Sequence, residues 1–96
     1  MSAYIIVDTR IKNPEAYEDY KAKARPIAEK FGGVYLARGG DMDVVQDELW
    51  SPTRIVLIQF PNKGKAREFL DCEEYAPVKA LRLANADCTL VLVEGE

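Results

Sequence analysis

Histidine is absent from this sequence of 96 residues. Without it, neither a Ser-His-Asp nor a Cys-His nucleophile system can form, and the commonest side-chain ligand of metals and haem is missing. Any acid–base chemistry must therefore use carboxylates, tyrosine, lysine or arginine. We expect a protein with no metal site and no cofactor.

Cysteine is nearly absent as well. Cys72 and Cys88 are the only two, and no CxxC pair exists, so neither a zinc site nor a redox motif is indicated. A disulfide is not expected in a reducing compartment. Cys88 lies in an apolar stretch and is interpreted as a small buried hydrophobic residue.

The chain also lacks an excess of positive charge and any long apolar run. Its net charge is -3 and its pI is near 5.0, which argues against a nucleic-acid partner. No apolar stretch approaches the ~20 residues of a membrane span, and the first ten residues do not resemble a signal peptide. We expect one cytoplasmic domain, residues 1–96, with no membrane partner.

What is present predicts alternating strands and helices. A β-branched run at 4–11 indicates a strand, and Asn13 with Pro14 predicts the start of a helix that ends at the glycine pair 32–33. Within this helix Pro26 is expected to cause a kink or to relax the last turns. One face of the helix should carry Tyr17, Tyr20, Ala24, Ile27 and Phe31, which step by three and four residues.

The remaining segments complete a known order of elements. We predict further strands at 34–38, 54–60 and 87–96, short helices at 63–71 and 74–85, and a small hairpin arm at 42–50. The order strand, helix, strand, strand, helix, strand is that of the ferredoxin-like βαββαβ plait. The predicted class is α+β, with a four-stranded antiparallel sheet.

The sheet should have a second apolar face. Strand 54–60 is apolar in both phases of its alternation, whereas the plait covers only one face of the sheet with helices. Leaving several large side chains in water would forfeit several kcal/mol at ~25 cal/mol per Å². We therefore predict a homodimer in which a second copy covers this face, a dimeric α+β barrel.

Motifs along nearly the whole chain resemble one known family. "YLARGG" after the glycine pair, "W.P.R.V.I.FP", "EY" followed by "LR", and the terminal "LVLVEG" are similar to domain-of-unknown-function family 1330. The resemblance implies the fold and the dimer of the α+β barrel superfamily, which includes cofactor-independent monooxygenases, muconolactone isomerases and stress-responsive proteins. It implies no particular reaction.

Alternation places candidate polar residues on the faces of the strands. Asp8 is expected on the barrel-facing side, Arg38 on one face with Val34 and Leu36, and Gln59 on one face with Ile55 and Leu57. A pocket of Asp8, Arg38 and Gln59 would suit a small carboxylate or enolate, with Arg38 as the anion partner. Alternatively, Asp8 and Arg38 form a buried ion pair.

Two further residues are candidates. Arg54 falls in the other phase of its strand, so a site joining it to Arg38 requires a bulge or a twist. Trp50 is either a wall on which a ligand stacks or a packing anchor on the partner subunit. The glycines at 39 and 40 either form a turn or let the backbone approach a ligand closely.

The function hypotheses are three. The first is binding of a small anionic or aromatic molecule in a barrel cleft. The second is a cofactor-independent enzyme acting on a small organic acid, lactone or aromatic compound by proton transfer or oxygen insertion. The third is a non-catalytic structural or stress-associated barrel. An interior cavity of ~300 Å³ or more would favour an enzyme.

Overall fold

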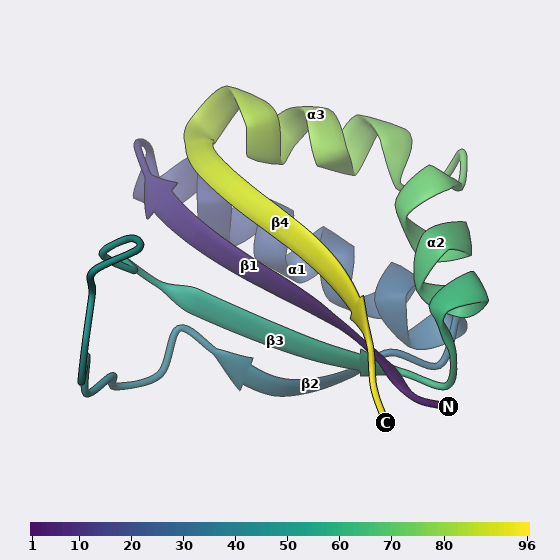
Figure 1. Cartoon of the computed structure of the whole chain (residues 1–96). Helices are drawn as coiled ribbons and strands as arrows, with labels where there is room; N and C mark the ends of the chain where they lie inside the picture. Colours follow the sequence, from purple (N-terminus) through teal and green to yellow (C-terminus); the bar gives the residue numbers. More distant parts are fainter.

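Helices cover only one face of the sheet. The computed structural model describes residues 1–96, and its neighbouring strands are all antiparallel in the order β2-β3-β1-β4. This is the predicted ferredoxin-like α+β arrangement. The elements are β1 (Ala3–Ile11), α1 (Pro14–Lys30), β2 (Val34–Arg38), β3 (Ile55–Phe60), α2 (Lys63–Asp71), α3 (Ala76–Asn85) and β4 (Ala86–Glu94) (Figure 1).

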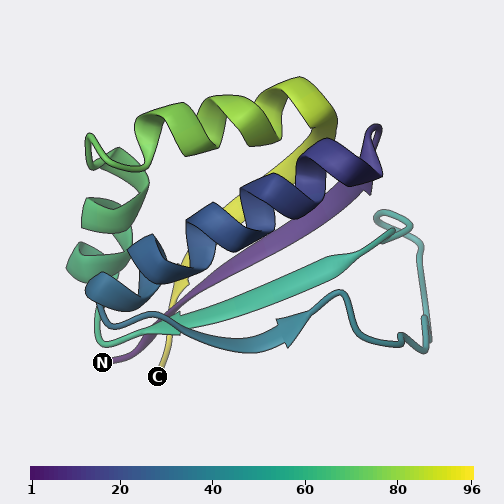
Figure 2. The ribbon, with the colours of Figure 1, turned by 180° about the vertical axis from the view of Figure 1, so that it is seen from behind.

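Helix α1 begins and ends where the sequence predicts. The side chain of Asn13 accepts a hydrogen bond from the backbone N–H of Ala16 at 3.3 Å, and Pro14 occupies the first turn. After the helix, Gly32 adopts a φ of +84°, which a side chain would disfavour. Pro26 lies inside α1 without ending it. Helices α1 and α3 then pack side by side over the sheet (Figure 2).

The core lies between the sheet and the helices. On β1 the buried side chains are those of Ala3, Ile5, Val7 and Thr9, which alternate along the strand and share the face toward the helices. Aromatic rings continue the core toward α2 and α3: Phe69 lies 4.5 Å from Tyr75, centroid to centroid. Full burial of a large apolar side chain contributes about 2 kcal/mol, so this single layer supplies most of the stability of the fold.

Strand β2 contains a β-bulge that the sequence pattern did not predict. Tyr35 pairs with Ile58, but the next pair is Ala37 with Leu57, so Leu36 is the extra residue. The bulge shifts the alternation by one position. Arg38 therefore faces the helices, and the prediction that it shares a face with Val34 and Leu36 is wrong.

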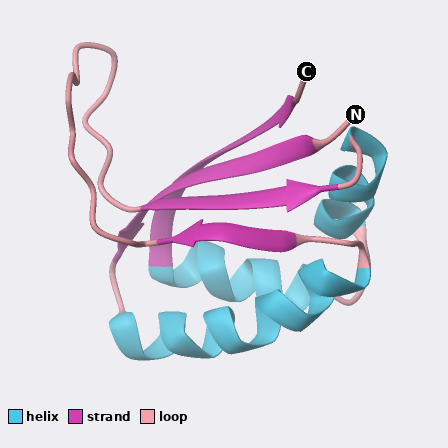
Figure 3. Ribbon diagram, turned by 90° about the horizontal axis from the view of Figure 1, so that it is seen from below, coloured by secondary structure: helices cyan, strands magenta, loops and turns pink.

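Residues 39–54 form an irregular arm, not the predicted hairpin extension. No strand is present between Arg38 and Ile55, and the arm projects from one end of the sheet toward the face that carries no helices (Figure 3). Apolar side chains in it are exposed, Val45 at 89% and Leu49 at 93%. A hairpin needs a buried face for such residues, and within one chain Val45 and Leu49 have none. No helix of the protein has the length and apolarity to cross a membrane.

Candidate functional site

The predicted site residues divide between the two faces of the sheet. Asp8 and Gln59 lie on the uncovered face, whereas Arg38 and Arg54 point toward the helices. The predicted pocket of Asp8, Arg38 and Gln59 therefore does not form. The sequence predicted that Arg38 and Arg54 could share a site only if the strand contained a bulge or a twist. The bulge in β2 is present, and the two arginines line one cavity.

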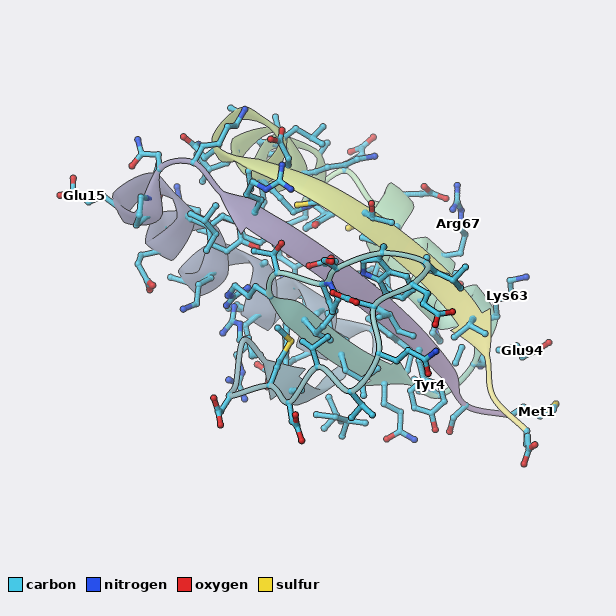
Figure 4. The ribbon with its side chains drawn as sticks, turned by 60° about the vertical axis from the view of Figure 1, so that its left-hand side comes forward. Met1, Tyr4, Glu15, Lys63, Arg67 and Glu94 are labelled. Atoms are coloured by element: carbon cyan, nitrogen blue, oxygen red, sulfur yellow. The ribbon has the colours of Figure 1, made fainter.

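Gln59 is also far from Asp8 along the sheet. It stands opposite Tyr4, whereas Asp8 stands opposite Ile55 at the other end of β3. Its side-chain amide donates a hydrogen bond to Ser2 Oγ at 3.1 Å. Tyr4 lies at the end of the sheet where the two chain termini meet (Figure 4). Gln59 is thus a neighbour of the N-terminus rather than part of a polar cluster.

Asp8 ties the end of the arm to β1. Its Oδ1 accepts hydrogen bonds from the backbone N–H groups of Thr53, at 2.8 Å, and Arg54, at 3.0 Å, and its Oδ2 accepts one from Trp50 Nε1 at 3.1 Å. Partial burial acts to raise the pKa of Asp8, but these hydrogen bonds outweigh it and hold that pKa below its usual value. Asp8 is ionised at neutral pH and fixes the backbone of Arg54.

A wide hollow surrounds Asp8 on the uncovered face. Its volume is about 430 Å³. Both oxygens of Asp8 already accept hydrogen bonds from within the chain, so no oxygen of this carboxylate requires a ligand as its partner. The hollow is lined by Asp8, Arg10, Trp50, Ser51, Thr53, Asp87, Cys88 and Thr89.

A second, much smaller cavity lies between the sheet and the helices, with a volume of about 30 Å³. We call it the arginine–tyrosine cleft. Its walls come from β1, α1, β2, α3, β3 and the residue just before β3. The lining residues are Val7, Tyr17, Tyr20, Lys21, Tyr35, Arg38, Arg54, Val56, Ile58 and Arg82.

Arg54 enters the cleft from the residue before β3. Its guanidinium carbon lies 5.5 Å from the ring centroid of Tyr17, within the range of a cation–π contact. Its Nη1 is buried and has no hydrogen-bond partner. Gly39 makes room for it: a Cβ there would lie 2.5 Å from Arg54 Nε, and the φ of Gly39 is +69°. Gly40 has open space around it, so only the first glycine of the pair is required.

Arg38 lies near the mouth of the cleft. Its guanidinium carbon is 4.6 Å from the ring centroid of Tyr35, and its Nη2 donates a hydrogen bond to the backbone carbonyl of Lys21 at 2.7 Å. No carboxylate pairs with it, and Asp8 is on the opposite face. The alternative of a buried Asp8–Arg38 ion pair is therefore wrong.

Arg82 is a residue of the candidate site that was not predicted from the sequence. It is only 6% exposed, and its Nε has no hydrogen-bond partner. Burial acts to lower the pKa of Arg82, but the neighbouring Tyr75, Cys88 and Tyr20 together outweigh it and leave that pKa above its usual value, so the guanidinium is charged. The signal was its spacing: Arg82 follows the inward Val78 by four residues, on the same helical face.

Tyrosine hydroxyls complete the lining. Tyr20 and Tyr75 share a hydrogen bond of 2.8 Å between their hydroxyl oxygens, so one of the two keeps its own O–H free to donate elsewhere. Burial, followed by the nearby Tyr75, raises the pKa of Tyr20 far above its usual value. Burial raises the pKa of Tyr35 to about 12. The hydroxyls of Tyr20 and Tyr35 are therefore neutral at physiological pH.

The charges lining the cleft are unbalanced. Lys21 pairs with the exposed Glu18 at 3.1 Å, but Arg38, Arg54 and Arg82 form no ion pair, and no lining residue carries a carboxylate. Nor do any three His, Cys, Asp or Glu side chains in the chain group as metal ligands do. Chemically, the cleft offers fixed positive charge and neutral hydroxyls, a combination suited to holding an anion.

The fold is shared with solved structures. A protein of unknown function from Rhodopseudomonas palustris, RPA0582, matches 99% of this chain and 82% of its own, with 17% identity and a TM-score of 0.77. SnoaB, a cofactor-independent oxygenase from Streptomyces nogalater, matches 99% of this chain and 93% of its own, with 9% identity and a TM-score of 0.71. An antibiotic biosynthesis monooxygenase matches 100% of this chain and 99% of its own, with 24% identity and a TM-score of 0.54.

Comparison of the sequence itself finds one family. The model of a family described as "Domain of unknown function (DUF1330)" matches residues 2–96. No curated protein matches the sequence. The likeness to the solved structures concerns the fold, because each is less than 25% identical to this chain.

Proposed function

The chain belongs to the DUF1330 family, and we propose that its function is to bind a small anionic molecule in the arginine–tyrosine cleft. The observation that supports this is the charge imbalance of the cleft. Arg38, Arg54 and Arg82 converge there without one carboxylate among the lining residues. Buried charge is normally paired, because leaving water is costly for an ion without a counter-charge. An anionic ligand supplies that counter-charge.

The surroundings of the arginines support the same proposal. The ring of Tyr17 lies against the guanidinium of Arg54, and the ring of Tyr35 against that of Arg38. Nη1 of Arg54 has no hydrogen-bond partner. A guanidinium edge presents parallel N–H donors that match the two oxygens of a carboxylate. Apolar walls at Val56 and Ile58 lower the local dielectric and strengthen that attraction.

Binding can be tested with the purified protein by calorimetry. Small organic acids should bind, whereas their neutral amides should not, because the amide lacks the charge that the arginines complement. Arg54→Met should weaken binding, while Arg67→Met on α2, whose partner is the exposed Asp71, should leave it unchanged. Equal binding of acids and amides, or equal loss in both variants, would show that the cleft is not an anion site.

We also propose that the functional unit is a homodimer. The uncovered face presents Val34, 56% exposed, and Val91, 49% exposed. The arm, which carries the exposed Leu49 and Trp50, projects toward the same side of the sheet (Figure 3). A second copy with the same face provides an apolar surface of matching extent. Sedimentation equilibrium at micromolar concentration should give twice the chain mass, and a monomer there would contradict the proposal.

A cofactor-independent enzyme is the second candidate, and the fold likeness to SnoaB supports it. The cleft volume of about 30 Å³ weighs against an aromatic or lactone substrate, since ligand pockets usually exceed ~300 Å³. Oxygen uptake with electron-rich phenols is the test. Consumption that requires the protein and is lost in Arg54→Met would favour the enzyme over simple binding.

A further inference from the structure

Two buried donors on opposite walls of the cleft lack acceptors. Arg54 Nη1 comes from the residue before β3 and Arg82 Nε comes from α3, and both side chains line the same cavity. These are the only buried side-chain nitrogen or oxygen atoms of the chain without a partner. Buried donors are rarely left unpaired in folded proteins, so two of them lining one cavity indicate a place where an acceptor can bind.

No side chain of the protein accepts a hydrogen bond from either of these two atoms. Tyr75 and Cys88 lie beside the Arg82 guanidinium, but neither partners its Nε. Tyr20 already shares its hydroxyl with Tyr75, and the remaining walls near them are apolar, as at Val7 and Val56. Arg38 donates a hydrogen bond to the backbone carbonyl of Lys21. The buried donors without a partner therefore belong to Arg54 and Arg82. These two donors are thus available to an acceptor that enters the cleft.

The free volume limits what can enter. A cavity of about 30 Å³ is two or three times the room that a single water requires, which is about 10–15 Å³ on the same measure. A carboxylate group, with three non-hydrogen atoms, is of this size, and a short alkyl substituent on it would lie along the apolar wall. An aromatic ring is larger, and the cleft would have to open to receive one.

We infer that the anion held in this cleft is a carboxylate of one to three carbons, which accepts hydrogen bonds from Arg54 and Arg82 together and rests its short chain on the apolar wall. This inference rests on the proposed function. It narrows the ligand class from any small organic anion to short-chain carboxylates. It also makes Arg82, on α3, a ligand-binding residue.

The experiment is a size series. Thermal unfolding and calorimetry are recorded with sodium formate, acetate, propionate and benzoate, against sodium chloride at the same ionic strength and against acetamide. The expected result is a rise in Tm with the three short carboxylates and none with benzoate or acetamide. Arg54→Met and Arg82→Met should each weaken acetate binding by about ten- to a hundredfold, the usual worth of one charged hydrogen bond.

Two further variants complete the test. Arg82→Lys retains a positive charge without the Nε donor and should also bind acetate more weakly, which covers the case in which Arg82→Met does not fold. Arg67→Met, remote from the cleft, should match the unaltered protein.

The outcomes separate the two proposals. Short carboxylates that bind through both arginines support the inference. Binding of benzoate but not acetate, with loss in Arg54→Met, would overturn the size limit and keep the anion site. Acetate binding that survives both Arg82 variants would overturn the role of Arg82. No response to any carboxylate would overturn the anion site itself.

Discussion

Trp50 donates its indole N–H to Asp8 at 3.1 Å, and through this bond the arm is fastened to the first strand. The same carboxylate holds the backbone N–H of Arg54, whose side chain passes to the other face of the sheet. Asp8 on one face thus positions a cleft arginine on the other. It acts on the proposed site through Arg54 rather than by touching a ligand.

Asp8→Asn should therefore have two effects. Loss of the charge weakens three hydrogen bonds on a partly exposed carboxylate, and we expect the free energy of unfolding to fall by about 1 kcal/mol. Acetate binding should weaken as well, because the backbone of Arg54 is less firmly held. Urea unfolding and calorimetry measure the two effects. Asp87→Asn, on the same face, is the control, and an equal effect in that variant would remove the special role of Asp8.

The pH dependence of stability follows from the lowered pKa of Asp8. Its usual value is 3.8, and the folded chain holds it lower, so ionised Asp8 stabilises the fold. This contribution is fully present above the unfolded pKa and is lost as the pH falls from about 4 through the folded pKa. Urea unfolding between pH 2 and 6 should show this loss in the unaltered protein and not in Asp8→Asn. Parallel curves for the two proteins would contradict it.

Asp8 and Arg38 should behave as independent residues. They lie on opposite faces and share no contact, so the effects of Asp8→Asn and Arg38→Met on stability should add to within about 0.5 kcal/mol. Unfolding of the two single variants and the double variant gives the coupling free energy. A double variant that is more stable than Arg38→Met alone would be evidence for an ion pair between Asp8 and Arg38 and would contradict this prediction.

The glycine pair offers a matched comparison. Gly39→Ala forces a side chain into a positive φ, which costs about 1 kcal/mol, and directs its Cβ at the guanidinium of Arg54. Both stability and acetate binding should fall. Gly40→Ala meets nothing and should change neither. Thermal unfolding and calorimetry on the two variants make the measurement, and a loss of binding in Gly40→Ala would mean that the turn as a whole is needed.

Trp50 should report on the dimer. It is the only tryptophan and is exposed on the side where we propose that the second copy packs. Dimer formation would bury part of the indole, so its fluorescence maximum should move to longer wavelength when the protein is diluted from micromolar to nanomolar concentration. An emission spectrum that is constant over this range, together with a constant mass, would mean that the arm does not lie at the interface.

Local sequence signals predicted most of the fold. The cap at Asn13, the glycines after α1 and the apolar strands at β1 and β3 each depend on neighbouring residues, and each was confirmed. The candidate site depended instead on the phase of β2. Val34, Leu36 and Arg38 fit a regular strand, and no residue in "VYLAR" marks a bulge, since bulges are set by pairing with the next strand.

Arg82 was missed for a different reason. A charged residue on an amphipathic helix is normally assigned to the solvent side. The structure buries Tyr75, Val78 and Arg82, one helical stripe with a charge at its end. Spacing could have indicated this position, but only the cleft gives a reason to bury a charge there. The irregular shape of the arm at 39–54 has a third cause, because Val45 and Leu49 remain exposed within one chain.

The bulge at Leu36 has a consequence for comparing this chain with its relatives. Arg38 shares a face with Val56, and Tyr35 shares that same face with Ile58, although three positions separate the two β2 residues. A chain without the extra residue would keep both side chains inward at a spacing of two. In such a relative, the arginine equivalent to Arg38 follows its tyrosine by two positions, whereas Arg38 follows Tyr35 by three. Alignment of the two chains requires a single-residue gap at Leu36, and a gap-free alignment would pair this arginine with a residue on the wrong side of the sheet.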